Sequence, residues 1–372
     1  MHSEQYEHAA RFGQRPLLVF WETTRSCPLA CKHCRAEAVM GRNPLELDLT
    51  EAKALIDGLA KGFTRPPVLV LTGGDPLMRD DLEDIVAYAR SRGISSAVSP
   101  AVSPALNEPR MRELARLGVR SVSISLDGIG GTHDLIRGVS GHYGETLSAI
   151  TMLQELGYRV QINTTVMAAN QFELATIANT LLEQKVGIWE VFFLIELGRG
   201  LTLRSLTPSA NEDVAAFLGF ISPYFSAVRT VEGPFYRRIL SGRVGPLGAL
   251  YEKLISEFQG SVRVHDRTPI GAKTRDGGGI LFISHFGEIY PSGFLPIKLG
   301  DVRVDDIGEI YRGHPLLRVI REGDMHGRCG ACDFSSICGG SRARAYASFG
   351  DPLGEDPACG YKYIGEGELV TT

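Results

Sequence analysis

The sequence predicts an α/β protein built as a partial (β/α)6 barrel of the TIM type, with a small cysteine-rich module at its C-terminal end. Three observations support this prediction. Short β-rich runs alternate with helical patterns over the first two hundred residues, several of the helical patterns stop just before a glycine, and six of the seven cysteines lie in two tight groups.

Six segments have the length and composition of buried strands, and each is bounded by Gly, Pro or Ser. They are residues 17–22, 68–71, 94–98, 121–125, 159–166 and 188–194. Five helical patterns alternate with them, at residues 50–61, 81–92, 108–117, 145–156 and 171–184. This alternation favours a parallel sheet with right-handed crossovers, and six units fall short of the eight that close a full barrel.

The alternation stops after Arg204. Two helices are expected in a connecting region, at residues 211–229 and 248–258. A turn at 274–279 and a β-hairpin with strands at 280–284 and 288–291 open the cysteine-rich module, and a helix is expected to begin near Cys338. The predicted domains are the barrel at 14–205, the connecting region at 206–275 and the cysteine-rich module at 276–365.

The composition is that of a folded enzyme rather than of a tail, a fibre or a membrane protein. The 372 residues are 44% hydrophobic and 22% charged, with a formal net charge of −4. The sequence lacks the basic excess that nucleic-acid and anionic-membrane partners usually require. No apolar run approaches the roughly 20 residues of a membrane helix, and residues 1–16 contain no apolar signal core. We therefore expect a cytoplasmic protein without a nucleic-acid or membrane partner.

Cys27, Cys31 and Cys34 lie within eight residues, just after the first predicted strand. Thiolates ligate soft metals, and four of them would close a tetrahedral zinc site or fully ligand a [4Fe-4S] cluster. Three cysteines leave one iron of such a cluster without a protein ligand, and that iron is free to do chemistry. The odd total of seven cysteines argues against a disulfide framework. A zinc site, with His33 or a distant side chain as fourth ligand, is the alternative.

The spacing of this triplet resembles the cluster-binding motif of the radical S-adenosylmethionine (SAM) superfamily, with His33 at a position that is usually aromatic. The resemblance implies that the open iron chelates the amino and carboxylate groups of SAM. It also implies that an electron from the cluster cleaves SAM to a 5'-deoxyadenosyl radical. An external electron donor such as flavodoxin or ferredoxin would supply that electron.

Residues 72–76, Thr-Gly-Gly-Asp-Pro, follow the second strand and resemble the Gly-Gly-Glu-Pro motif of this superfamily, which receives the SAM amino group. The resemblance gives this role to Gly73, Gly74 and Asp75. Asp75 is one methylene shorter than the usual glutamate, while the backbone contacts stay the same. Taken alone, Gly-Gly-Asp-Pro also fits an ordinary strand-to-helix turn.

The segment from Ser125 to Asp127, and Arg137 beyond it, are similar to the peptide-maturase and heme-pathway branches of the superfamily. The resemblance implies that Ser125 and Asp127 lie near the SAM ribose and Arg137 near its carboxylate, which a guanidinium can bind with two hydrogen bonds. An ion pair at the surface is the alternative for Arg137. Asn163 and Thr165 share one face of the fifth strand, where they contact SAM or are satisfied core groups.

One segment departs from the pattern of the relatives. Many of them carry Thr-Asn-Gly after the third strand, whereas this chain has a Ser- and Pro-rich stretch that begins at Ser99. Ser99 or Ser103 is expected to supply the missing contact to SAM.

The second group of cysteines contains four residues, at Cys329, Cys332, Cys338 and Cys359. Four thiolates suit a fully ligated [4Fe-4S] cluster, or a structural zinc. This region resembles the auxiliary-cluster modules of the SPASM and twitch types. Full SPASM modules carry two clusters, but Ser292 and Ser341 stand where further ligands would fall. One auxiliary [4Fe-4S] cluster is therefore expected.

The spacing of these four cysteines resembles radical SAM enzymes of alternative heme and heme d1 biosynthesis, which act on propionate side chains. Such chemistry removes a hydrogen from a propionate carbon and then releases carbon dioxide and an electron, which the auxiliary cluster accepts. We expect a small carboxylated substrate such as a tetrapyrrole. The candidate partners of its carboxylates are Arg199, Arg204, Arg342 and Arg344, and the candidate acids, bases or axial ligands are His265, His285 and His314. A solvated or structural role is the alternative for each.

Two other functions fit parts of the sequence. Maturation of a ribosomally synthesised peptide, by crosslinking, thioether formation, epimerisation or decarboxylation, uses the same domain order. The short stretch before the first strand leaves no room for a peptide-recognition domain, which disfavours this function mildly. A two-cluster electron carrier or redox sensor is the non-enzyme alternative, and the open iron and the glycine motif count against it. The sequence assigns no catalytic side chain.

Overall fold

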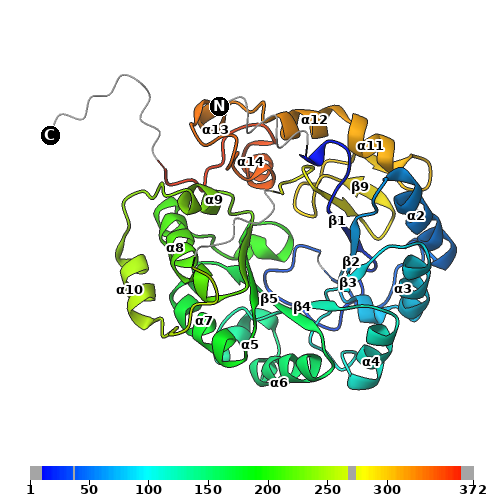
Figure 1. Ribbon diagram of the computed structural model, residues 1–372, viewed down its shortest axis with the longest axis horizontal. Coiled ribbons are helices and arrows are strands. Elements are labelled where there is room, and N and C mark those ends of the chain that lie inside the picture. The colour runs from blue at the N-terminus through cyan, green and yellow to red at the C-terminus, as the bar shows by residue number, and fades with distance from the viewer. Residues whose placement is uncertain (1–10, 37, 267–273, 362–372) are drawn as a thin grey trace.

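The computed structural model describes residues 11–36, 38–266 and 274–361 (Figure 1). Its main feature is one sheet with the strand order β10-β9-β8-β1-β2-β3-β4-β5-β6-β7. The seven strands in chain order up to the connecting region are β1 (Leu18–Glu22), β2 (Val68–Thr72), β3 (Ser96–Val98), β4 (Ser121–Ser125), β5 (Arg159–Val166), β6 (Ile188–Phe193) and β7 (Ala227–Val231). The C-terminal strands are β8 (Ile280–Ile283), β9 (Glu288–Tyr290) and β10 (Gly300–Asp301). Every neighbouring pair from β8 through β7 is parallel, and β9 and β10 are antiparallel.

Helices cover the outer face of the curved sheet (Figure 1). Those in the barrel are α2 (Leu49–Gly62), α3 (Leu82–Ser91), α4 (Glu108–Arg116), α5 (Gly131–Arg137), α6 (His142–Glu155) and α7 (Leu174–Glu183). The connecting region holds α8 (Pro208–Ile221), α9 (Phe235–Leu240) and α10 (Ala249–Glu257). The C-terminal helices are α11 (Ile307–Gly313), α12 (Pro315–Glu322), α13 (Gly327–Ala331) and α14 (Arg342–Phe349), and short 3-10 turns lie at Pro76–Met78, Gln171–Glu173, Gly198–Thr202 and Ser222–Tyr224.

Local sequence explains where the helices begin. The Asp48 carboxylate accepts from the backbone of Glu51, whose own carboxylate accepts from the backbone of Asp48, so a capping box starts α2. Asn107 and Thr207 cap α4 and α8 in the same position, each followed by a proline in the first turn. These signals satisfy backbone groups that the first turn of a helix leaves without partners.

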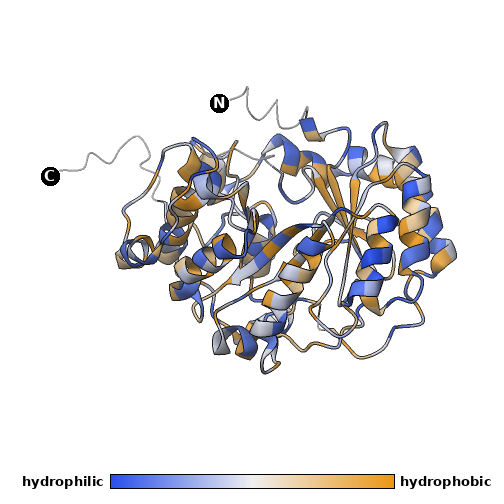
Figure 2. Cartoon of the chain, turned by 60° about the horizontal axis from the view of Figure 1, so that its bottom comes forward, coloured by the Kyte–Doolittle hydropathy of each residue, from blue (hydrophilic) through white to orange (hydrophobic). Residues whose placement is uncertain are grey.

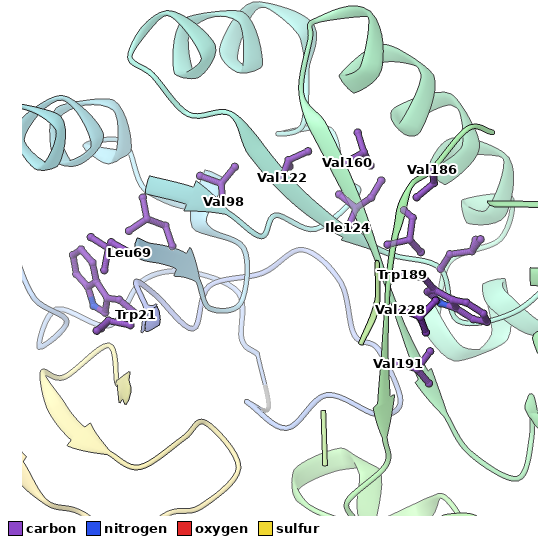
Figure 3. Packing of buried hydrophobic residues seen from close by; sticks show 14 of the residues in the cluster. Trp21, Leu69, Val98, Val122, Ile124, Val160, Val186, Trp189, Val191 and Val228 are labelled. Carbon is purple, nitrogen blue, oxygen red and sulfur yellow. The ribbon is translucent and has the colours of Figure 1, made fainter. Parts of the chain in front are cut away.

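The hydrophobic core lies between the sheet and its outer helices. Val19 and Trp21 of β1 are fully buried on this side, whereas Leu18 and Phe20 alternate onto the inner face. Figure 3 shows the same core running along the sheet from Trp21 to Val228, and Figure 2 shows hydrophobic residues concentrated on the strands. We call the inner face of the sheet the lumen. Because its side chains are only partly buried along β4 and β5, it is where polar groups meet solvent or a ligand.

The structure confirms the six predicted strands and the five helical patterns between them, and it corrects the connecting region. Residues 211–229 do not form one helix: α8 ends at Ile221, Ser222–Tyr224 forms a turn, and Ala227–Val231 is a seventh parallel strand beside β6. Pro223 in the second position of the turn cannot donate to a continuing helix, so the helical pattern stops there. The helix expected near Cys338 begins at Arg342, since Gly339 and Gly340 have φ values of 70° and 65°.

The barrel is not closed, and the C-terminal segment spans its open side. β8 pairs in parallel with β1, and Gly287, with a φ of 86°, turns β8 back into β9 as the sequence predicts. On the opposite edge, Arg344 of α14 donates to the backbone oxygen of Glu232 just after β7, at 2.7 Å. Figure 1 shows α13 and α14 beside α9. Among the described residues, no helix is long and apolar enough to cross a membrane.

Candidate active site and metal centres

The cysteine triplet lies on the loop that follows β1, at the carboxyl edge of the parallel strands. Cys27 and Cys31 are buried and Cys34 is half-buried. The 3-10 turn after β6 holds this loop from the other side: the backbone N–H of Arg199 donates to the Cys34 oxygen at 3.2 Å, and its Nε donates to the Cys31 oxygen at 3.0 Å. The loop after β1 and the 3-10 turn after β6 therefore hold the three thiols together at the mouth of the lumen.

The residues around the triplet fit an iron-sulfur cluster. The Leu29 N–H points at the Cys27 sulfur, 3.4 Å away, a hydrogen bond of the kind that stabilises ligand thiolates. Burial raises the pKa of Cys27 to about 11 and also raises that of Cys31. Thiolates at these positions therefore need a bound cationic partner, which cluster irons supply. The described residues contain no group of three or more His, Cys, Asp or Glu side chains that could hold a single metal ion.

The two motif glycines allow the loop after β2 to pack directly on the segment that leads from β1 into the triplet. The Gly74 N–H donates to the Thr24 oxygen at 2.7 Å, and the Asp75 N–H donates to the Ser26 oxygen at 2.8 Å. A Cβ on Gly73 would lie 2.3 Å from the Thr24 oxygen, and a Cβ on Gly74 would lie 2.4 Å from the Ser26 oxygen. Only glycine fits at either position, so both have a structural reason to be there whether or not they contact SAM.

Asp75 is completely buried. Its carboxylate accepts from the Leu77 N–H and from the Ser103 hydroxyl, each at 3.0 Å. Burial raises the pKa of Asp75, and these hydrogen bonds oppose that rise. Ser103 is therefore linked to the glycine motif by its hydrogen bond to Asp75. Ser99 is half-buried directly after β3, where its N–H continues the ladder to the Leu71 oxygen at 2.9 Å.

Asp127 joins three segments of the site. Its carboxylate lies 3.3 Å from Nη1 of Arg137 and 3.4 Å from Nε2 of His33, and it accepts from the Thr165 N–H at 2.8 Å. Burial alone raises the pKa of Asp127, but its contacts with His33, Arg137 and the Thr165 N–H outweigh this effect and hold the pKa below its usual value. The structure therefore brings His33, Asp127 and Arg137 together, with the acid already engaged by protein donors.

A buried pair of histidines, His133 and His142, packs against Asp127, and the sequence analysis did not predict it. The Asp127 N–H donates to Nδ1 of His133 at 3.0 Å, so the His133 proton lies on Nε2, which points at Nδ1 of His142, 2.8 Å away. His142 in turn donates to the Val102 oxygen at 2.9 Å. Burial lowers the pKa of His133 to about 4, so the pair is neutral at pH 7. Histidines six and fifteen residues after Asp127 carry no spacing signal of their own.

Polar side chains line the lumen on the next strands. Ser125 on β4 is in register with Asn163 on β5. Gln161 donates from Nε2 to Oδ1 of Asn163 at 2.8 Å and to Oε2 of Glu190 at 2.9 Å. Burial raises the pKa of Glu190. Nδ2 of Asn163 makes no hydrogen bond within the described chain, so it is available to a ligand in the lumen.

A second cluster at the mouth joins β1 to the C-terminal segment. Glu22 accepts from Arg35 at 3.0 Å and lies 2.7 Å from Nδ1 of His285, although His285 is 263 positions away. The Arg35 guanidinium lies over the ring of Phe282, 4.9 Å from its centroid, and over Phe294 at 5.9 Å. This places a cation, a histidine and two aromatic rings beside the triplet. Of the three candidate histidines, His285 is the one that the structure brings next to the site.

Two of the candidate arginines are engaged elsewhere. Arg342 is 1% exposed and donates to the oxygens of Pro352 and Gly354 at 3.0 Å and 2.6 Å. Arg344 is 8% exposed and pairs with Asp356 at 3.0 Å. Neither guanidinium is available to a substrate carboxylate in this conformation.

The four C-terminal cysteines line one pocket, together with Phe235, Arg238, Phe334 and Asp356. Backbone N–H groups point at their sulfurs: Phe334 at Cys332, 3.4 Å away, and Asp356 at Cys329, 3.3 Å away. Burial raises the pKa of Cys338 to about 12. As at the triplet, thiols that are at least partly buried and that receive N–H donors fit a bound cluster, and here all four ligands are present.

Comparisons with known proteins agree with this geometry. The profile described as "Radical SAM superfamily" matches residues 21–181. The chain is 36% identical to an AdoMet-dependent heme synthase of Nitratidesulfovibrio vulgaris, over 93% of this chain and 92% of that protein. It is 29% identical to a pre-heme d1 synthase of Dinoroseobacter shibae, over 94% and 87%. The crystal structure of Streptococcus suis SuiB bound to S-adenosylmethionine has the same fold, with a TM-score of 0.65 and 15% identity over 95% of this chain and 80% of that one.

Proposed function

The chain belongs to the radical SAM superfamily, and on that premise we propose that it oxidatively decarboxylates propionate side chains of a tetrapyrrole. The observation that carries the proposal is the pairing of two different cysteine sites. Three cysteines stand at the open mouth of the barrel, and four line a pocket in the C-terminal segment. A site with three ligands suits SAM cleavage, and a site with four suits electron transfer.

The triplet residues Cys27, Cys31 and Cys34 would hold the first [4Fe-4S] cluster. A cluster bound there would supply the electron that cleaves SAM to a 5'-deoxyadenosyl radical, and a second cluster in the four-cysteine pocket would take up the electron that the oxidised substrate releases. Nδ2 of Asn163 is free to donate to SAM, and the Gly73 and Gly74 backbone forms the wall beside the triplet. Ser99, Ser125 and the pair of Asp127 with Arg137 complete the proposed SAM surroundings.

The overall reaction balances in atoms and electrons. The radical takes one hydrogen atom from the carbon β to the carboxylate and becomes 5'-deoxyadenosine. The bond between the neighbouring carbon and the carboxylate then breaks, carbon dioxide leaves, a vinyl group forms and one electron is given up. The relative at 36% identity is an AdoMet-dependent heme synthase, and that relationship supports this substrate class for the present chain.

The mouth of the barrel offers contacts for such a substrate. Arg35 carries a partly exposed guanidinium beside Phe282 and Phe294, which suits a flat aromatic ring with a carboxylate at its edge. His285, held by Glu22 through Nδ1, presents the arrangement of carboxylate and histidine that orients an imidazole for proton transfer or for binding a metal.

An external one-electron donor such as flavodoxin or ferredoxin would reduce the first cluster. All seven cysteines are free thiols, which fits a reducing compartment such as the cytoplasm.

The test uses the anaerobically reconstituted protein with SAM, a strong reductant and an iron porphyrin that carries propionates. We expect 5'-deoxyadenosine together with a porphyrin that has lost the elements of formic acid at each converted propionate. SAM cleavage without porphyrin conversion would overturn the assignment of a porphyrin substrate. The same assay would then be repeated with a precursor peptide. If no 5'-deoxyadenosine forms, the assignment of this protein as an enzyme would be overturned, and an electron carrier would be favoured.

The role of the second cluster has its own test. Replacing Cys359 by Ala should abolish porphyrin conversion while SAM cleavage continues, because the released electron then has no acceptor. Normal conversion by this variant would show that the four-cysteine site is not required.

A further inference from the structure

Three arginines lie close to the four-cysteine pocket without forming an ion pair to any described residue: Arg275 and Arg342 are buried and Arg237 is partly buried. Each has a buried guanidinium nitrogen that makes no hydrogen bond, namely Nη1 of Arg237, Nε of Arg275 and Nη2 of Arg342. Within the part of the chain that the structure describes, none of the three forms an ion pair. Their neighbours differ in this respect, because Arg238 pairs with Glu212 and Arg344 with Asp356.

Two of these guanidiniums approach the pocket where its wall is glycine. A Cβ on Gly340 would lie 2.5 Å from Nη2 of Arg342 and 2.7 Å from the sulfur of Cys329, so the guanidinium and the thiol meet across the space that the glycine leaves open. A Cβ on Gly339 would lie 2.8 Å from Nη1 of Arg275. Both glycines line the pocket and both have positive φ, and neither contributes a side chain that would separate these guanidiniums from the cysteines.

The local charges favour an anion at the four-cysteine pocket. Burial lowers the pKa of Arg275 to about 9, the charges of Arg237 and Arg342 lower it further, and the charges of Cys338 and Asp276 oppose this shift without cancelling it. A buried charge is costly unless an opposite charge compensates it. A [4Fe-4S] cluster with four thiolate ligands is anionic, so it would compensate the positive charges of these arginines. Reduction makes the cluster more negative, so the arginines would stabilise its reduced form more than its oxidised form.

We propose that Arg275 and Arg342, with Arg237 behind them, raise the reduction potential of the auxiliary cluster, so that it accepts the electron that substrate oxidation releases. This inference rests on the proposed function, because it requires a cluster at the four cysteines. It concerns the chain's own cations and not the cysteine ligands. The roles of Arg275 and Arg342 are electrostatic, and neither residue contacts the substrate.

The experiment is a redox titration of the reconstituted holoenzyme followed by electron paramagnetic resonance. Added SAM identifies the signal of the first cluster, because only that cluster has an open iron. We expect Arg275→Met and Arg342→Met each to lower the equilibrium constant for reduction of the auxiliary cluster at least about tenfold, which is 59 mV for a one-electron couple. Arg275→Lys and Arg342→Lys keep the charge and should recover most of the shift.

Arg328→Met is the matched control. Arg328 lines the same pocket, but its side chain is 56% exposed and pairs with Glu355 at 3.0 Å, so solvent already screens its charge. Its replacement should leave the auxiliary potential within a few millivolts of the wild type. A shift as large as that of the Met variants would overturn a specific role for the buried pair.

The remaining outcomes also decide the question. If the Met variants lose the auxiliary cluster while the Lys variants keep it, the positive charge is required for the cluster and the proposal stands. Loss of the cluster from the Lys variants too, or an unchanged potential in Met variants with full iron content, overturns it. Iron for one cluster only in the wild type would overturn the second cluster of the proposed function, which is a distinct result.

Discussion

Gln161 and Asn163 lie two residues apart on β5, and the hydrogen bond from Nε2 of Gln161 to Oδ1 of Asn163, 2.8 Å long, decides which end of the Asn163 amide faces the lumen. The other Gln161 amide hydrogen goes to Glu190 at 2.9 Å. Since Gln161 donates to both neighbours, Asn163 must accept from it with its oxygen and turn its NH2 group toward a ligand.

Replacing Gln161 by Glu tests this relay, because the shape is kept and the donors are removed. A carboxylate at position 161 accepts from the Asn163 NH2 group and so turns the amide around. We expect SAM affinity to fall about two- to tenfold, the effect of one neutral hydrogen bond, as measured by equilibrium dialysis of the anaerobic protein. Gln154→Glu on α6, outside the lumen, is the control. Equal SAM affinities in both variants would refute the relay.

Removing one partner of the buried pair of Asp127 and Arg137 should strongly destabilise the protein. Their side chains are 1% and 9% exposed, so removal of one charge leaves the other buried and unpaired. We expect Asp127→Ala to lower the free energy of unfolding by about 3 to 5 kcal/mol in urea denaturation followed by tryptophan fluorescence. In a double-mutant cycle with Arg137→Met, the double variant should lose less than the sum of the single variants. Strict additivity would show that the two charges are not coupled.

Features encoded locally were predictable from the sequence. The spacing of Cys27, Cys31 and Cys34, the alternation of strands and helices, and the hairpin at Gly287 depend on residues close together in the chain, where periodicity and turn chemistry give clear signals. The seventh strand was not predictable in this way, because residues 211–229 combine a helical pattern with a short β-rich end beyond Pro223.

The parts of the site that sequence reasoning missed depend on long-range packing. Glu22 contacts His285 only because β8 pairs with β1, and no sequence pattern near Glu22 predicts that contact. Arg342 was a candidate for binding substrate because it follows a cysteine motif. Its place in the interior follows from the contacts of α14, which a single sequence does not reveal.

The close contact at Gly73 predicts that the single methyl group added by Gly73→Ala affects both stability and SAM binding. Gly73 has a φ of 145°, and a Cβ there would lie 2.3 Å from the Thr24 oxygen, a backbone atom that cannot move aside cheaply. Gly93→Ala is the matched control, since Gly93 also has positive φ, 76°, but nothing lies within 4 Å of its Cβ position. Gly93→Ala should cost about 1 to 2 kcal/mol of stability and leave SAM binding intact. Gly73→Ala should in addition abolish SAM binding in the same dialysis assay, and retention of binding would show that the β2 loop can shift away.

The His133 environment predicts how stability depends on pH. Burial lowers the pKa of His133 from 6.5 to about 4; the Asp127 charge opposes this shift, and the charges of Arg137 and His142 add to it. Between these two pH values the unfolded chain binds a proton at His133 that the folded protein excludes, so folding loses stability as pH falls through this window. At about 1.4 kcal/mol per pKa unit, His133 accounts for a loss of about 3 kcal/mol between pH 6.5 and pH 4. His133→Asn keeps an acceptor near the Asp127 N–H but does not titrate, so its free energy of unfolding in urea should fall less steeply with acid than that of the wild type. All other acidic and histidine groups are common to both proteins, so the difference between the two pH profiles isolates the contribution of His133. Parallel profiles would mean that this histidine is protonated in the folded protein as readily as in the unfolded chain.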